Sequence, residues 1–149
     1  MKPLDTLDSL LRFKGRRVWS IAPTATVYDA ISQMSEKSVG ALLVISEGHL
    51  AGIISERDYA RKVILLDRSS KETEVREIMT ERLITASPSD TVEECMRSMT
   101  EHRIRHLPVL DGDEVVGLVS IGDLVNWIIT AHEETIGHLQ GYIEGRYPG

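Results

Sequence analysis

Two short segments of the chain carry a glycine, a serine and an acid at the same spacing. They are GIISERD (residues 52–58) and, 65 residues later, GLVSIGD (residues 117–123). A serine followed three residues later by an acid favours a helix start at which both side chains cap the backbone. The same helix start suits a phosphate, because its N–H groups are unpaired and carry partial positive charge. The acid could then accept hydrogen bonds from vicinal ribose hydroxyls. A cap and a ligand site are compatible, so the spacing leaves both open.

Basic residues near these segments differ between the two copies. Arg57 lies inside the first segment, where the second has Gly122, and an arginine can donate two hydrogen bonds to one phosphate. Ahead of the second segment, RIRH (residues 103–106) opens an apolar run whose counterpart begins with Gly40 and Ala41. These basic residues could guard a solvated strand edge or clamp a phosphate. We expect the two copies to form chemically different sites.

The two segments belong to a longer internal repeat. Sliding the sequence against itself by 65 residues aligns Pro23 with Pro88 and Met34 with Met99 without a gap. Such a repeat predicts two copies of one structural unit. We expect the copies over residues 15–66 and 80–131, a linker over 67–79, and flanking helical segments over 1–14 and 132–149.

Each copy has the pattern of a short extended piece, a helix, two strands joined by a tight turn, and a second helix. The stretches 26–38 and 91–103 have helical apolar spacing, and paired apolar runs follow each of them. Neither small sheet can be covered within its own copy, so the copies should pack together. The sequence predicts an α/β (α+β) fold of two β-α-β-β-α motifs about a pseudo-twofold axis, with flanking terminal helices.

The composition limits the functions that the chain can have. A net charge of -6 argues against a general nucleic-acid binder, which usually shows a basic surface. The single Cys95 excludes an intramolecular disulfide, and the five histidines lack metal-site spacing, so we expect no metal. No nucleophile stands beside a recognisable base, so we expect no enzyme. Neither a signal peptide nor an apolar span is evident, which predicts a cytoplasmic protein without membrane contact.

The repeated unit resembles the tandem cystathionine-β-synthase (CBS) domain pair, also called a Bateman module. The likeness covers residues 15–131 and includes both GxxSxxD segments, the RHLPV run and the spacing between them. The resemblance is to a stand-alone member, because no kinase, channel, dehydrogenase or synthase domain accompanies the pair. It implies a regulatory fold that binds adenosine-containing ligands in clefts between the motifs. AMP is the first expectation, and ATP, ADP, NAD(H) and S-adenosylmethionine are the alternatives.

The resemblance also implies which residues form the two clefts. The first would use Ser55, Arg57, Asp58, Thr80, Ile84, Ala86, Ile104, Arg105 and His106. The second would use Lys14, Trp19, Ser20, Val39, Gly40, Ala41, Ser120 and Asp123. Asp58 and Asp123 would accept from ribose hydroxyls, whereas Arg57, Arg105 and His106 would neutralise phosphate. The second cleft lacks matching cations at Gly40, Ala41 and Gly122, so it could bind weakly, bind an uncharged adenosyl group or remain empty.

The regulated partner is not encoded in the sequence, so regulation should act in trans on another protein. Apolar residues at helical spacing near both ends predict a homodimer through the flanking segments. Trp19 and Trp127 are interpreted as core or interface residues rather than as platforms for adenine. Two alternatives remain: a scaffold dimer without ligand, in which SxxD is only a cap, and a nucleotide-processing enzyme that uses Asp58 or His106.

Overall fold

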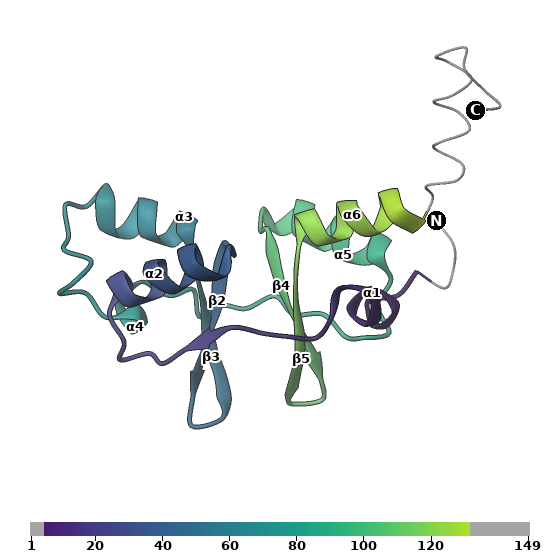
Figure 1. Ribbon diagram of the computed structural model, residues 1–149, viewed down its shortest axis with the longest axis horizontal. Helices are drawn as coiled ribbons and strands as arrows, with labels where there is room; N and C mark the ends of the chain where they lie inside the picture. Colours follow the sequence, from purple (N-terminus) through teal and green to yellow (C-terminus); the bar gives the residue numbers. More distant parts are fainter. Residues whose placement is uncertain (1–4, 132–149) are drawn as a thin grey trace, which may run out of the picture.

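The structure is a computed structural model that describes residues 5–131. Two similar halves lie side by side, each with a long β-hairpin on one side and its helices on the other (Figure 1). The first half contains β1 (Ser20–Ile21), α2 (Val27–Lys37), β2 (Ala41–Ser46), β3 (His49–Ser55), α3 (Glu56–Tyr59) and its π-helical continuation η1 (Ala60–Ile64). The second half contains α5 (Val92–His102), β4 (His106–Asp111), β5 (Glu114–Ser120) and α6 (Ile121–Ala131). Two further helices, α1 (Leu7–Lys14) and α4 (Val75–Ile78), precede the halves along the chain.

The first helix of each half begins and ends in the same way. Thr26 and Thr91 cap α2 and α5, and each side chain accepts from the backbone N–H three residues later. The helices end at Ser38 and Arg103, which both adopt the left-handed conformation. The apolar faces of both helices are buried, as their spacing predicts. The buried residues are Val27, Ala30 and Met34 in α2, and Val92, Cys95 and Met99 in α5.

The hairpins repeat in register as well as in sequence. Ala41 pairs with Ser55 in the first hairpin, and His106 pairs with Ser120 in the second. Each hairpin has an irregularity at the equivalent place, between Val44 and Ile45 or between Val109 and Leu110. The lead-in pieces differ: β1 pairs parallel to β2, whereas the second copy forms only an isolated bridge between Ala86 and Val109.

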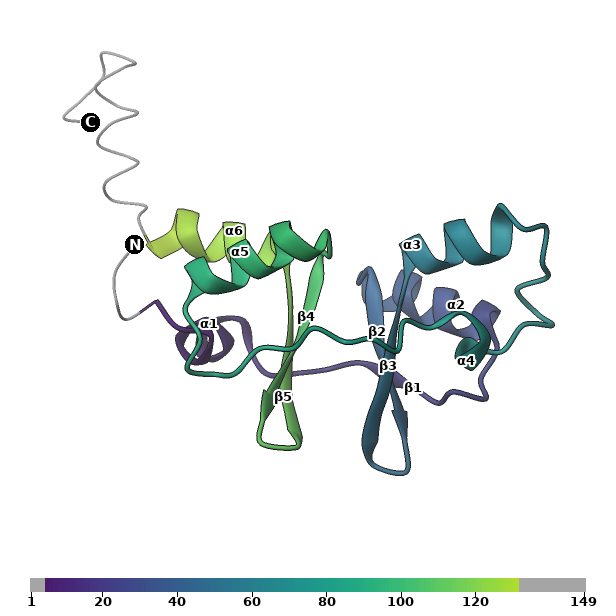
Figure 2. The same ribbon diagram turned by 180° about the vertical axis from the view of Figure 1, so that it is seen from behind.

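The two helices that precede the halves along the chain each pack on the other half: α1 precedes the first half and packs on the second, and α4 precedes the second half and packs on the first. α1 contributes Leu7, Leu10 and Leu11 to the core of the second half, whereas α4 contributes Val75 and Ile78 to the core of the first. Figures 1 and 2 show the segments after α1 and α4 crossing from one half to the other. The predicted flanking segment, through α1, therefore supplies part of the second core, and the predicted linker, through α4, supplies part of the first.

Close packing against the exchanged segments explains two glycines in the hairpins. A Cβ on Gly117 would lie 2.7 Å from a methyl group of Leu11, and one on Gly52 would lie 2.8 Å from the carbonyl oxygen of Thr80. Only glycine lets these segments approach so closely. Within the described residues, no helix has the length and apolar character needed to cross a membrane. The predicted helical segment 132–149 lies outside the described residues.

Candidate ligand-binding clefts

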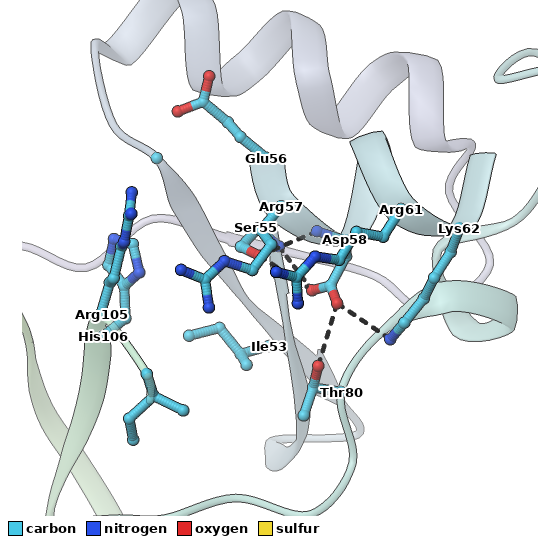
Figure 3. A pocket seen from close by; sticks show the side chains of 12 residues that line it. Ile53, Ser55, Glu56, Arg57, Asp58, Arg61, Lys62, Thr80, Arg105 and His106 are labelled. Carbon is cyan, nitrogen blue, oxygen red and sulfur yellow. Dashed lines mark hydrogen bonds and ion pairs between the residues drawn. The ribbon is translucent and has the colours of Figure 1, made fainter. Parts of the chain in front are cut away.

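The start of α3 opens onto a cleft of about 370 Å³ between the two halves. β3, α3 and η1 supply one wall, and the segment before β4 supplies the other (Figure 3). The lining residues are Gly40, Ile53, Ser55, Glu56, Arg57, Asp58, Arg61, Lys62, Thr80, Ile104, Arg105 and His106. Polar and charged groups therefore converge on one cavity that also has apolar walls, which is typical of small-molecule sites.

Asp58 lines this cleft, although it is only 8% exposed. Its Oδ2 accepts from Ser55 N (3.0 Å) and Ser55 Oγ (3.1 Å), while its own N–H donates to Ser55 Oγ (3.2 Å). These bonds form a complete capping box. Its Oδ1 accepts from Thr80 Oγ1 (3.2 Å) and Lys62 Nζ (3.0 Å). The cap therefore uses one carboxylate oxygen, and the other is held by groups that line the cleft.

Cations reach the first cleft from both halves. Arg57, Arg61 and Lys62 project from the α3–η1 side, and Arg105 stands on the opposite side beside the imidazole of His106, whose pKa is lowered by burial (Figure 3). The guanidinium of Arg57 also donates to the carbonyl oxygen of Arg103, at 3.0 Å. This bond joins the start of α3 to the segment that leads into β4. The cleft can therefore attract an anionic group placed between the halves.

A second cleft, of about 300 Å³, lies at the start of α6. Its lining residues are Lys14, Arg17, Val18, Trp19, Ser38, Val39, Gly40, Ala41, His106, Leu118, Ser120 and Asp123. Asp123 Oδ2 accepts from Ser120 N (2.8 Å), and Asp123 N donates to Ser120 Oγ (3.1 Å). Lys14 Nζ lies 2.5 Å from Asp123 Oδ2 and also donates to the carbonyl oxygen of Leu118. An acid at a helix start is thus paired with a lysine in both clefts.

The sequence that forms these two halves and their clefts matches one known family. The family model described as "CBS domain" matches residues 15–65 and 75–130. The chain belongs to the CBS-domain family. The protein CBSX3 of Arabidopsis thaliana, described as mitochondrial, is 44% identical over 151 residues, which cover 95% of this chain and 73% of the relative.

Solved structures of CBS proteins share the fold. A protein with CBS domains from Burkholderia ambifaria MC40-6 superposes with a TM-score of 0.81 and 52% identity, over 84% of this chain and 94% of that chain. The CBS pair of protein MJ0100 gives a TM-score of 0.75, over 85% of this chain and 97% of that chain. It is described in complex with 5′-methylthioadenosine and S-adenosyl-L-methionine, and at 23% identity it shows the fold alone.

The CBS pair brings most of the predicted site residues to the expected clefts. Those that line the first are Ser55, Arg57, Asp58, Thr80, Ile104, Arg105 and His106. Those that line the second are Lys14, Trp19, Val39, Gly40, Ala41, Ser120 and Asp123. Ile84 and Ala86 do not line the first cleft, because both pack against the core of the second half. Ser20 lies in β1 and does not line the second cleft.

Several cleft residues were not predicted from the sequence. Arg61 and Lys62 stand three and four residues after Asp58, so helical spacing could have placed them on the same face. The second cleft also contains Arg17, which was not among the residues predicted for it. This cation and Lys14 reach the second cleft because α1 packs on the second half and the chain then crosses back.

The two tryptophans lie in different environments. Trp127 packs against the second core and meets Phe13 edge to face, with ring centroids 5.6 Å apart. Trp19 packs against the first core, as interpreted, but it also lines the second cleft. Lys37 Nζ lies 4.5 Å from the centroid of the Trp19 ring, and such a contact attracts a cation to the ring face.

Proposed function

We propose that this CBS pair is a regulatory module that binds an adenine nucleotide, AMP first, in the cleft beside Asp58. One observation carries the proposal: a buried carboxylate at the start of α3 shares its cleft with cations from both halves. A nucleoside monophosphate offers ribose hydroxyls to a carboxylate and a dianionic phosphate to guanidinium groups. The cleft contains both kinds of partner.

The proposed arrangement follows from the chemistry of each wall. Asp58 Oδ1 accepts from a ribose hydroxyl, which competes with Lys62 for this oxygen. Arg57 and Arg105 then neutralise the phosphate, together with the released ammonium group. Ile53 and Ile104 offer apolar surfaces on which the base can lie.

The second cleft is proposed as a distinct and weaker adenosyl site. Among its lining residues only Lys14 and Arg17 are lysine or arginine, against four in the first cleft, and Lys14 is paired with Asp123, so a phosphate meets fewer cations there. ATP, ADP, NAD(H) and S-adenosylmethionine remain alternative ligands for either cleft. The adenosyl compounds described with the CBS pair of MJ0100 justify testing uncharged and cationic ligands as well as nucleotides.

The proposed output is a change in how the two halves contact each other. A ligand that touches both α3 and the segment before β4 acts on the place where Arg57 already bonds the carbonyl of Arg103. It can shift a conformational equilibrium only by its difference in affinity between two states. A separate protein then reads that difference in trans. We propose a cytoplasmic, non-catalytic role, although the relative CBSX3 is described as mitochondrial.

Isothermal titration with AMP, ATP, NADH and S-adenosylmethionine tests the proposal. We expect Asp58→Asn to weaken AMP binding at least about tenfold, because a hydrogen bond to a buried charge contributes about 1.5–3 kcal/mol. Asp123→Asn is the matched control and should keep binding in the first cleft. Equal AMP affinity in the parent and Asp58→Asn, or no heat with any ligand, would leave SxxD as a pair of helix caps.

The enzyme alternative is tested in the same samples. Phosphorus NMR of AMP or ATP incubated with the parent protein reports any hydrolysis or phosphoryl transfer. We expect the nucleotide to remain intact. Turnover that disappears in Asp58→Ala would replace the regulatory proposal with a catalytic one.

A further inference from the structure

His106 occupies the place where the two clefts meet. Among the described residues, only His106 and Gly40 line both. A Cβ on Gly40 would lie 3.6 and 3.7 Å from Cε1 and Nε2 of the His106 ring, so the two residues form one shared wall. The position of His106 is fixed, because it begins β4 and pairs with Ser120. A single imidazole is therefore exposed to ligands in either cleft.

Charged groups face this ring from several elements. Those that act on it are Lys14 of α1, Arg57 of α3, Arg105 before β4 and Asp123 of α6. Glu56 of α3 and Arg17 before β1 line the same two clefts. The pKa of His106 is lowered, first by burial and then by the cations Lys14, Arg105 and Arg57, while Asp123 opposes them. The ring is therefore predominantly neutral near pH 7. Each cleft contains at least one of the cations that disfavour its protonation.

We propose that His106 couples the two clefts: an anionic ligand in one cleft favours the protonated imidazole, and that cation favours an anionic ligand in the other. The inference rests on the proposed nucleotide sites and adds a regulatory link between them. The negative charge of a phosphate offsets the cations that face the ring, so binding raises the pKa of His106 and takes up protons at pH values between the pKa of the free protein and that of the complex. Linkage is reciprocal, so each cleft has the same effect on the other.

The sign of the pH dependence follows directly. A phosphate raises the pKa of His106, so the complex binds more protons than the free protein. AMP affinity should therefore increase as the pH falls through the range in which the ring of the complex becomes protonated. This increase in AMP affinity at lower pH should occur in both clefts, although their acids and their other cations differ.

NMR of the full chain with carbon-13-labelled histidine rings tests the coupling. The variants Asp58→Asn and Asp123→Asn each leave AMP one intact cleft. We expect AMP, at a concentration that fills only the intact cleft, to raise the pKa of His106 in both variants, with the signal assigned by its loss in His106→Gln. The exposed His49 and His102 serve as references that should not move.

A second measurement does not depend on those acidic variants folding. We expect the ratio of AMP dissociation constants at pH 8 and pH 6 to be about fivefold or more larger in the parent than in His106→Gln, a typical coupling strength. The phosphate of AMP itself titrates near pH 6, and the comparison removes that effect because it is common to both proteins.

The outcomes separate this inference from the proposed function. AMP binding in the parent, with a His106 pKa that responds in only one acidic variant, overturns the coupling and leaves the nucleotide site standing. AMP binding confined to one cleft, or equal pH ratios in the parent and His106→Gln, also overturns it. No AMP binding in the parent defeats the proposed function, and the coupling falls with it.

Discussion

At the scale of the residue, one side chain of the SxxD spacing, that of Asp58, both caps a helix and lines a cleft. The sequence predicted both a cap and a ligand acid, and Asp58 makes the complete cap while its second oxygen faces the cleft. The partners of that oxygen were harder to predict. Thr80 was expected in the cleft through family resemblance, whereas the Lys62 ion pair depends on the rotamer of a long side chain. Spacing predicts proximity but not such a contact.

The stability contribution of the first cap should exceed that of the second. The side chain of Asp58 is 10% exposed and that of Asp123 is 26% exposed, so solvent screens the second more strongly. We expect Asp58→Asn to lower the free energy of unfolding by about 1–2 kcal/mol and Asp123→Asn by less. Urea unfolding monitored by circular dichroism measures both. Equal losses would show that burial does not strengthen the first cap.

Cys95 should be chemically inert in the folded chain. Burial raises its pKa to about 12, and the nearby Asp90 and Glu94 add to the effect. Because only the thiolate reacts readily, we expect no reaction with Ellman's reagent at pH 8 until urea unfolds the protein. The folded thiol also favours stability below about pH 8.5, and this contribution is lost as the pH rises toward 12. Rapid labelling of the folded protein would contradict the buried position.

At the scale of the element, the exchanged helices were beyond the reach of sequence patterns. Helical spacing correctly predicts an apolar face for residues 7–14, but it does not say which surface covers that face. The sequence suggested a dimer contact for this segment, whereas Leu7, Leu10 and Leu11 are buried in the second core of the same chain. The exchange also carries Lys14 to Asp123. Folding within the chain therefore supplies a residue to a distant cleft.

The packing of α1 and α4 on opposite halves predicts which half unfolds locally more often when a cavity is made in each helix. Leu10 and Ile78 are both 1% exposed, so they form a matched pair. Replacement of either by Ala should cost about 2–5 kcal/mol. Under native conditions we expect Leu10→Ala to raise amide hydrogen exchange in α5, β4 and β5, and Ile78→Ala to raise it in α2, β2 and β3. Faster exchange in the first half of Leu10→Ala would contradict the observed packing.

At the scale of the whole molecule, the repeat predicts the architecture but does not predict how the two clefts differ from each other. A shift of 65 residues places the helices, the hairpins and both helix starts. It aligns His106 with Ala41, so it cannot show that one imidazole lies between two clefts. That position follows from packing the halves against each other. The repeat thus predicts the features within a copy, the family resemblance predicts most of the residues that line each cleft, and the sharing of His106 between the clefts needed the structure.

The exposed apolar residues of the helical layer predict that a second copy of the chain covers it. Ile64 and Ile129 occupy equivalent repeat positions and are 56% and 52% exposed, and Leu65, at 75%, adjoins the first. The elements that contain these two isoleucines, η1 and α6, lie on the helical side of the molecule, away from the hairpin turns (Figure 1). Their burial in a homodimer removes apolar surface from water, at about 25 cal/mol per Å². We expect light scattering to give twice the mass of one chain.

Charged substitutions on that face should separate the two copies. Ile64→Glu combined with Ile129→Glu puts carboxylates where apolar contact is required, so the dimer should dissociate to monomers at the same concentration. His49→Glu adds the same group to an exposed hairpin position and should leave the dimer intact. A parent protein that is already monomeric, or a double variant that remains dimeric, would show that this face is not the contact. Because both halves contribute equivalent positions, monomers produced by either single substitution would further show that the contact uses the pseudo-twofold symmetry of the chain.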